Sequence, residues 1–258
     1  MFCKGGFVCV PAGLAAWVLR IPVVIHDSDA HPGLANRILS RFAQRIATGA
    51  PLEFYNYPKE ISKYVGIPVL ENFKKYSVEE RRQFKKDIGV NSDESLVVVT
   101  GGGLGAARLN NAIVSQVGEL SSFTQIILIS GAGQFKELKS KTEQSPDNFH
   151  LFGFISQDMW KYLAAADLVV ARAGATSNLE LAALAKPTIL VPNGRLTGGH
   201  QLKNAQVYKK SNAVEIVSDD EIEYNPEILS SKIKEIVSDR LRMKRLSQEF
   251  SKFAKPHA

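Results

Sequence analysis

The sequence predicts an α/β protein with two Rossmann-like, doubly wound domains, the first of them incomplete. Three observations lead to this prediction. Between residues 96 and 217, short apolar runs alternate with helical patterns, as strands and crossover helices do in a parallel sheet. The same alternation occurs before residue 70, but with only about three strands. A charged helical stretch at 72–90 separates the two parts, so the predicted domains are residues 1–70 and 71–258.

The first part has too few predicted strands to form a whole domain. We expect strands at 7–10, 22–26 and 45–48, helices at 12–20 and 32–44, and a closing strand at 63–66. The run 22–26 is apolar on both faces, which is typical of a buried parallel strand. Pro32 suits the first turn of a helix. We therefore expect that a front section is missing or that a partner chain supplies this N-terminal segment.

The second part has a more regular pattern. Strands are expected at 96–100, 125–130, 148–152, 168–171, 188–191 and 213–217, and two helices at 226–238 and 240–254 close the chain. In such a sheet, ligands bind in the crevice outside the carboxyl ends of the strands. The loops that follow these strands are therefore the first places to look for a site.

Composition limits the class of protein. The chain has 258 residues, of which 45% are apolar and 22% charged, as in soluble globular proteins. The net charge of +6 indicates an anionic contact (phosphates, a nucleic acid or a membrane face) or simply a basic surface. The two cysteines, Cys3 and Cys9, cannot form a disulfide framework and fit a reducing compartment. No stretch reaches the roughly 20 apolar residues of a membrane span.

A glycine-rich loop follows the strand at 96–100. Within it, Gly102, Gly103 and Leu104 are candidates for binding phosphate, because a strand–glycine–helix turn presents backbone N–H groups to an anion. The alternative is a tight turn without a ligand. The loop also fits a dinucleotide fingerprint, but the next strand ends in Ser130-Gly131 where that fingerprint requires an acidic residue. An NAD or FAD enzyme is therefore disfavoured.

Two further loops follow later strands. After 168–171, the stretch from Arg172 to Glu180 could place a helix N-terminus at a diphosphate, with Glu180 accepting hydrogen bonds from ribose hydroxyls. Alternatively, Ser177 and Glu180 form a capping box and have only a structural role. After 188–191, Gln201 and Asn204 would share a helix face, while His200 could be an ordinary surface residue. Because all three loops lie at the same edge of the sheet, they are expected to converge on one crevice.

These residues resemble the MurG family of glycosyltransferases. The matching stretches cover nearly the whole chain in the family's order: 5–7, 11–17, 21–22, His26, 32–37, 66–69, the loop at 101 with 109–110, 154–155, 166–167, 172–175, 180–181, Pro187, 191–192, 200–201 and 204–205. The resemblance implies a GT-B architecture, in which the second domain holds a UDP-sugar and the first faces the membrane and a lipid acceptor.

The resemblance also implies an activity and its partners. The family moves N-acetylglucosamine from UDP-N-acetylglucosamine to a polyprenyl-diphosphate-linked muramyl-peptide in peptidoglycan synthesis, with inversion and without a metal or other cofactor. The expected location is the cytoplasmic face of the bacterial plasma membrane, as a peripheral protein on an anionic surface, and no nucleic-acid partner is expected. Two alternatives stay open: a related transferase with another lipid acceptor, and a non-catalytic UDP-sugar-binding subunit that needs a partner chain.

Roles for individual residues follow from the same resemblance. The substrate-binding candidates are Asp29, Gly102, Gly103, Leu104, Ile155, Arg172, Gly174, Ala175, Thr176, Ser177, Glu180, His200, Gln201 and Asn204. Among them, Ile155 would contact uracil and Glu180 the ribose, while Gln201 would contact the sugar or the diphosphate.

The chain also departs from the family pattern. It lacks a first glycine-rich loop, and Leu70, Gly103 and Asp29 replace an arginine, a serine and an asparagine. Arg108, Arg172 and Arg195 are candidates to replace the arginine. For the catalytic base, His26 and Asp27 are the candidates present, although His26 could merely end its strand.

Overall fold

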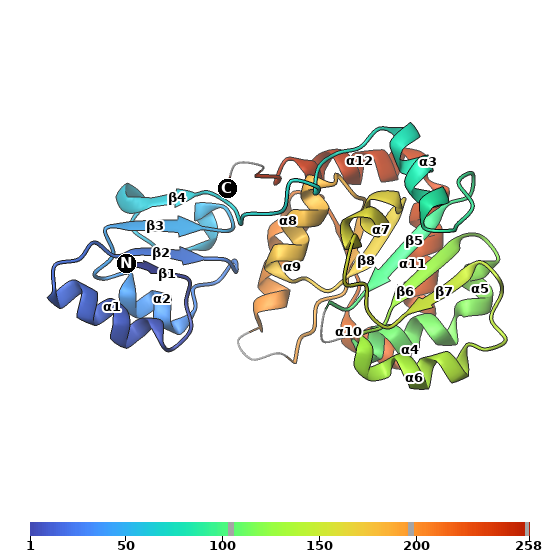
Figure 1. Cartoon of the computed structure of the whole chain (residues 1–258), viewed down its shortest axis with the longest axis horizontal. Coiled ribbons are helices and arrows are strands. Elements are labelled where there is room, and N and C mark those ends of the chain that lie inside the picture. Colours follow the sequence, from blue (N-terminus) through green and yellow to red (C-terminus); the bar gives the residue numbers. More distant parts are fainter. Residues whose placement is uncertain (103–105, 196–198, 256–257) are drawn as a thin grey trace.

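A computed structural model describes residues 1–102, 106–195, 199–255 and 258. It contains two parallel sheets, one of four strands and one of six, which lie side by side (Figure 1). Residues 65–77 connect them without helix or strand. The two predicted α/β domains are therefore present.

The first sheet has the strand order β1-β2-β3-β4, and every neighbouring pair is parallel. Its elements are β1 (Phe2–Cys3), α1 (Cys9–Val18), β2 (Val24–Asp27), α2 (Leu34–Leu39), β3 (Arg45–Thr48), the 3-10 turns η1 (Leu52–Phe54) and η2 (Lys59–Ile61), and β4 (Ser62–Tyr64). Its core includes Cys3, Ile25, Leu39 and Ile46, all essentially inaccessible to solvent. The strand predicted at 45–48 has the same bounds in the structure.

The strand predicted at 7–10 is wrong. Residues 2–3 form the strand beside β2, and residues 9–10 already belong to α1. Gly5 and Gly6, with φ of +88° and +82°, make the turn between them in a region that L side chains rarely adopt. Pro11 then lies in the first turn of α1, where a missing N–H breaks no helical hydrogen bond. The predicted helix at 32–44 is also shorter, because α2 ends at Leu39.

The second sheet has the order β10-β9-β8-β5-β6-β7, again all parallel. The strands are β5 (Leu96–Thr100), β6 (Gln125–Ile129), β7 (Phe149–Phe152), β8 (Leu168–Ala171), β9 (Thr188–Leu190) and β10 (Glu215–Ile216). Counted from β5, this is the strand order of dinucleotide-binding domains, and it reverses between β5 and β8. The carboxyl ends of β5 and β8 are therefore where a ligand crevice is expected.

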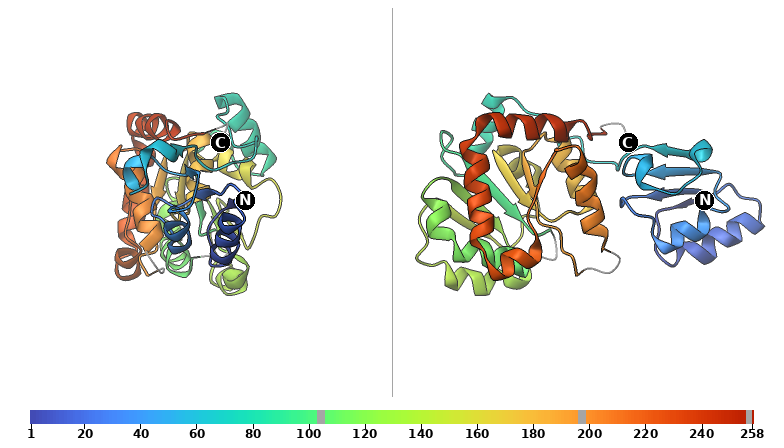
Figure 2. Two further views of the ribbon diagram at one scale, coloured as in Figure 1. Left: turned by 90° about the vertical axis from the view of Figure 1, so that its left-hand side faces the viewer. Right: turned by 180° about the vertical axis from the view of Figure 1, so that it is seen from behind.

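Helices cover both faces of this sheet. They are α3 (Val78–Asp87), α4 (Ala107–Ser115), α5 (Val117–Ser121), α6 (Ala132–Lys141), α7 (Met159–Ala165), α8 (Ala175–Ala183), α9 (His200–Lys210), α10 (Asp219–Tyr224), α11 (Glu227–Ser238) and α12 (Arg240–Ser251). Alternate residues of β5 enter different cores: Leu96 and Val98 pack on one side, Val97 and Val99 on the other. Figure 2 shows α11 and α12 against the second domain, after which the chain turns back toward the first.

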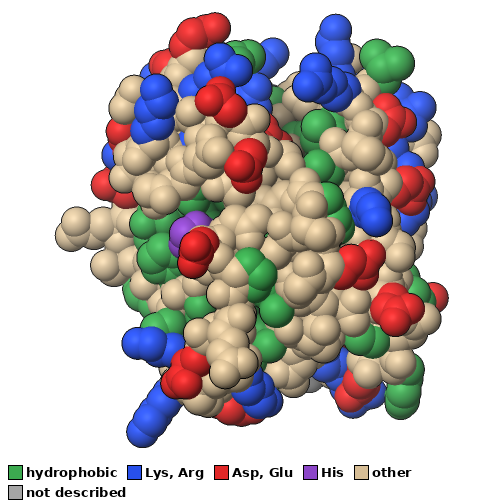
Figure 3. Space-filling view, turned by 90° about the vertical axis from the view of Figure 1, so that its right-hand side faces the viewer, with side chains coloured by type: hydrophobic (Ala, Val, Ile, Leu, Met, Phe, Trp, Pro, Cys, Tyr) green, Lys and Arg blue, Asp and Glu red, His purple; other side chains and the backbone are tan. Residues whose placement is uncertain are grey.

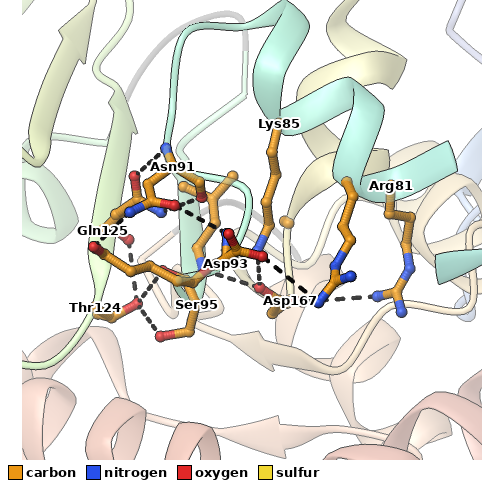
Figure 4. A network of polar contacts seen from close by, with 12 residues as sticks. Arg81, Lys85, Asn91, Asp93, Ser95, Thr124, Gln125 and Asp167 are labelled. Atoms are coloured by element: carbon orange, nitrogen blue, oxygen red, sulfur yellow. Dashed lines mark hydrogen bonds and ion pairs between the residues drawn. The ribbon is translucent and has the colours of Figure 1, made fainter. Parts of the chain in front are cut away.

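A polar network attaches α3 to the second sheet (Figure 4). The Lys85 ammonium donates to Asp167 Oδ2 at 2.7 Å and to the Glu94 carbonyl at 2.5 Å. The same Asp167 oxygen accepts the Leu96 N–H at the start of β5. The helix begins with a capping box between Ser77 and Glu80. This anchoring puts α3 in the second domain, and the boundary at residue 70 itself stays a prediction.

The two domains also touch elsewhere. Ala30, Ala50 and Tyr55 of the first domain belong to the same buried cluster as Val98 and Leu163 of the second. Beyond α12, the chain returns to the first domain, where the Lys255 ammonium lies 4.3 Å from the centre of the Tyr64 ring. At the far end of the second domain, acidic and basic side chains are interspersed (Figure 3).

Candidate functional site

A cavity of about 300 Å³ lies at the carboxyl edge of the second sheet. It is lined by Thr100, Gly101, Gly102, Ile129, Gly131, Gly153, Phe154, Ile155, Met159, Leu163, Ala171, Arg172, Gly174, Ser177, Glu180, Leu181 and Gln201. These residues come from the ends of β5, β6 and β8, from the loops after β5, β6, β7 and β8, and from α7, α8 and α9. The predicted convergence of loops on one crevice therefore occurs, at the point where the strand order reverses.

The loop after β5 begins with backbone that favours glycine. Gly102 has φ of +78°, and its N–H donates to Thr100 Oγ1 at 3.2 Å. With no Cβ, Gly102 allows a ligand to approach the backbone closely. The other candidates in this loop, Gly103 and Leu104, lie outside the described residues.

The start of α8 does not fit a capping box. The helix begins at Ala175 with Gly174 as its N-cap, and no side chain of the described residues caps it. Ser177 therefore lies inside the first turn, so the structural alternative for Ser177 and Glu180 is wrong. Uncapped N–H groups at a helix N-terminus favour an anion. Thr176 is exposed, and neither it nor Ala175 is among the cavity-lining residues.

Glu180 lines the same cavity one turn further along α8. Its side chain is half-buried, and burial raises the pKa of its carboxyl group above the usual value. Two residues of the loop after β7, Phe154 and Ile155, line the same cavity. A carboxylate beside an apolar wall can accept hydroxyl donors while a flat ring packs nearby.

The arginines predicted to stabilise a diphosphate form one ion-pair cluster with α10. Arg172 donates to Asp219 Oδ1 at 2.5 Å and to the Val191 carbonyl at 2.9 Å. Arg108 binds Asp219 Oδ2 at 2.8 Å, and Arg195 pairs with Glu223 at 3.0 Å. Of the three, Arg172 is the one among the described cavity-lining residues. Arg108 and Arg195 do not line the cavity.

A second cavity, of about 350 Å³, lies in the first domain. Its lining comprises Lys4, Gly5, Gly6, Phe7, Val10, Asp27, Ser28, Asp29, Gly33, Leu34, Ala35, Asn36 and Ile38. Asp27 is buried at the end of β2, and its Oδ2 accepts the Tyr57 hydroxyl at 2.7 Å. Burial raises the pKa of the Asp27 carboxyl, and the Tyr57 hydrogen bond acts in the opposite direction.

His26 has a structural role at the end of β2. It is buried, its Nε2 is 2.8 Å from the Gly66 carbonyl, and its Nδ1 is 3.3 Å from Ser28 Oγ. Both ring nitrogens therefore have partners within the first domain, and His26 does not line either cavity. These contacts hold the chain after β4 against β2, and the assignment of His26 as a catalytic residue stays a prediction.

The remaining candidates lie where the domains meet. Asn204 donates to Asp29 Oδ1 at 2.9 Å, and its Oδ1 accepts the Ala30 N–H at 2.8 Å. His200 Nδ1 stands 3.7 Å from Asp29 Oδ2. Gln201, one residue on, lines the cavity of the second domain while accepting the Asn193 N–H. Asn204 itself lines neither cavity.

Sequence reasoning missed Tyr57, the hydroxyl donor to Asp27. It lies in a loop-rich stretch, 30 residues further along the chain, and no periodicity connects the two. Lys4 was also missed as a cavity residue. Within residues 1–102, 106–195, 199–255 and 258, no group of three or more His, Cys, Asp or Glu side chains could hold a metal ion.

Comparison with known families decides the classification. Residues 96–258 match the glycosyltransferase family 28 C-terminal domain, and residues 1–48 match the N-terminal domain of the same family. The chain belongs to glycosyltransferase family 28. The two matches fall on the second and first domains of the structure, in the family's order.

Two family 28 relatives are 34% identical to the chain, and both are named UDP-N-acetylglucosamine–N-acetylmuramyl-(pentapeptide) pyrophosphoryl-undecaprenol N-acetylglucosamine transferase. One is from Caldicellulosiruptor saccharolyticus and covers 100% of the chain, the other from Halothermothrix orenii and covers 98%. The solved structure of Acinetobacter baumannii MurG superposes on the whole chain with a TM-score of 0.82 and 26% identity. The chain spans 60 to 70% of the length of such relatives. The GT-B arrangement predicted from the sequence is thereby confirmed.

Proposed function

We propose that this chain transfers N-acetylglucosamine from UDP-N-acetylglucosamine to a polyprenyl-diphosphate-linked muramyl-peptide, with inversion and without a metal. The names of its relatives support this reaction. The observation that carries the proposal is the cavity at the N-terminus of α8, which Glu180 and Ile155 both line. That cavity offers N–H groups for a diphosphate, a carboxylate for a ribose and an apolar wall for a base.

The proposed mechanism divides the reaction between the two cavities. Asp27, in the first-domain cavity, takes the proton of the acceptor hydroxyl as that oxygen attacks the anomeric carbon. The bond from that carbon to the diphosphate breaks, and the leaving UDP is stabilised by the α8 N-terminus, the Gly102 backbone and Arg172. A raised pKa makes Asp27 a stronger base than an ordinary carboxylate once it is ionised.

Calorimetric titration tests the donor site. We expect UDP-N-acetylglucosamine to bind more tightly than UDP-glucose or UDP-galactose, and NAD not to bind. Replacing Glu180 with Ala should weaken donor binding about 10- to 150-fold, because hydrogen bonds to a charged group contribute about 1.5–3 kcal/mol. Glu137→Ala, an exposed carboxylate on α6, is the matched control and should bind as the unsubstituted chain does. Equal affinities for the Glu180 variant and the control would remove Glu180 from the site.

A second candidate is a UDP-sugar-binding subunit that a partner chain completes. The observation that favours it is β1, which has two residues and pairs only with β2 among the described strands. Donor binding with no turnover by the chain alone, and turnover once a partner is added, would support this alternative. Turnover by the chain alone would exclude it.

We further propose peripheral binding to an anionic membrane surface at the cytoplasmic face. In the first domain, large apolar side chains are exposed on or beside α1: Phe7, Val8, Trp17, Val18, Leu19 and Ile21. The exposed basic residues Arg20, Arg37 and Arg41 lie in the same domain. Among the described residues, no helix is both long enough and apolar enough to cross a bilayer. Apolar insertion with basic side chains nearby suits an anionic lipid surface.

Vesicle sedimentation with phosphatidylglycerol tests this surface. Replacing Leu19, which is 69% exposed, with Ala should weaken binding about tenfold, because burying a leucine side chain contributes about 1.5–3 kcal/mol. Leu241→Ala, at an 81% exposed leucine of α12, is the control and should leave binding unchanged. Equal losses in the two variants would mean that the apolar face of α1 is not the contact.

A further inference from the structure

The side chain of Asn204 is a complete bridge between the domains. It is buried on α9, and each polar atom of its amide has a partner. Its Oδ1 accepts the Ala30 N–H at 2.8 Å, while its Nδ2 donates to Asp29 Oδ1 at 2.9 Å and to the Ala173 carbonyl at 3.1 Å. An amide has two N–H donors, and both are used here.

Of the three partners of Asn204, Asp29 lines a cavity, and Ala30 and Ala173 are each next in sequence to a cavity-lining residue. Asp29 and Ala30 lie in the loop between β2 and α2, and this loop lines the first-domain cavity together with Asp27. Ala173 directly precedes Gly174, the N-cap of α8 in the donor cavity. One side chain therefore holds the loop that follows the proposed base against the helix start that faces the proposed diphosphate.

The chemistry of the contact requires an amide at 204. Asp29 can only accept when ionised, and the Ala30 N–H can only donate, so the bridging group must offer a donor and an acceptor at once. A carboxylate at 204 would face Asp29 with like charge, and an alanine would leave the Ala30 N–H without its partner. His200 does not replace this bridge, since its Nδ1 is 3.7 Å from Asp29.

We infer that Asn204 is a positioning residue: its amide sets the spacing between the acceptor cavity in the first domain and the donor cavity in the second. It acts through Asp29 and Ala30 and lines neither cavity itself. The inference rests on the proposed transfer reaction for its kinetic readout, but its structural consequence can be measured without activity.

Hydrogen–deuterium exchange of the full chain measures that consequence. The Ala30 amide should exchange slowly because Asn204 accepts its proton, and a peptide covering residues 28–33 reports on it. In Asn204→Ala this peptide should exchange at least about tenfold faster. Gln206→Ala, an exposed amide on the same helix, is the matched control and should leave the exchange unchanged. Unchanged exchange in Asn204→Ala would overturn the inference.

Kinetics with a charge-swap pair measures the functional consequence. Asn204→Asp places two carboxylates together, and we expect kcat to fall about 10- to 100-fold, because small misplacements of reacting groups have effects of this size. The calorimetric Kd for UDP-N-acetylglucosamine should change less than about twofold, since Asn204 does not line the donor cavity. Adding Asp29→Asn restores a donor opposite the new carboxylate, so the double variant should regain part of the lost kcat, while the Ala173 carbonyl still lacks its donor.

The outcomes distinguish failure of the Asn204 bridge from failure of the proposed transfer reaction. A fall in kcat in Asn204→Asp that is partly reversed by adding Asp29→Asn supports the bridge. A fall in kcat that is not reversed, or an unchanged kcat in Asn204→Asp, overturns the bridge. If the unsubstituted chain shows no transfer at all, the proposed function fails, and the exchange measurement alone decides on the bridge.

Discussion

Replacing Asp27 with Asn is expected to lower kcat about 100- to 10,000-fold, the usual contribution of a general base. The amide has almost the same shape and its oxygen can still accept the Tyr57 hydroxyl, so the cavity should keep its form. Donor affinity should not change, because Asp27 lies outside the donor cavity. The measurement is steady-state transfer with a soluble acceptor analogue, together with titration of UDP-N-acetylglucosamine.

The same substitution should change stability in a pH-dependent way. The pKa of Asp27 is raised in the folded protein, so the folded state holds this proton more tightly than the unfolded state does. The stability that results is present below the unfolded pKa of about 3.9 and is lost as pH rises through the raised, folded value. At pH 8 the buried charge is therefore unfavourable, and Asp27→Asn should melt at a higher temperature than the unsubstituted chain.

Melting curves at several pH values test this predicted difference in melting temperature between Asp27→Asn and the unsubstituted chain. The advantage of the variant should shrink as pH falls toward 4, where Asp27 itself becomes neutral. Asp147→Asn, an exposed position in the second domain, should show no such trend. A variant that loses activity and melts lower at every pH would have a damaged fold, and the assignment of Asp27 as base would lose its support.

Replacing Asp219 with Ala is expected to reduce the free energy of unfolding by about 3–5 kcal/mol. Asp219 is 3% exposed and pairs with the largely buried Arg172, so its removal leaves a buried guanidinium uncompensated. The neighbouring Arg108 loses the same partner. Denaturant unfolding followed by the fluorescence of Trp160 measures the change, in a Trp17→Phe background so that only the second domain reports.

Asp220 provides the contrast. Its side chain is 58% exposed and pairs with Arg108 and Arg195 at the surface. Asp220→Ala should therefore reduce stability by less than about 1 kcal/mol. Similar losses in the two variants would mean that burial does not control the strength of this ion-pair cluster.

Much of the second domain could be predicted because its strands are buried on both faces. Leu96–Val99 and Leu168–Ala171 are uninterrupted apolar runs, and the strands predicted at 96–100 and 168–171 have the same bounds in the structure. The loops after parallel strands must meet at one edge of the sheet, so the strand pattern alone predicts that Gly102 and Glu180 share one cavity, whereas Ile155 was predicted from the family resemblance.

The wrong predictions for residues 7–10 and for the start of α8 have local causes. The apolar residues at 7–10 suit a strand as well as a helix. In the structure, the turn at Gly5-Gly6 ends the strand before them, and α1 begins at Cys9. A capping box requires Ser177 to be the N-cap of α8. The N-cap is instead Gly174, and the helix already begins at Ala175. In both cases, backbone geometry at a glycine overrode a side-chain pattern.

Contacts between distant segments could not be predicted at all. Asn204 and Ala30 are 174 residues apart in sequence, and Tyr57 reaches Asp27 from an irregular loop. No periodic pattern carries such information, because each contact depends on how two separately folded sheets are placed.

The chain crosses between its domains twice, once through residues 65–77 and once where Lys255 lies over Tyr64. In Figure 1 both crossings are at the same edge of the molecule, and α9 extends away from that edge. Rotation of the domains about that edge would displace α9, with its Asn204 bridge, further than it displaces either crossing. The Asn204 bridge and the buried cluster shared by the two domains therefore oppose such a rotation at the place where it would move the chain most.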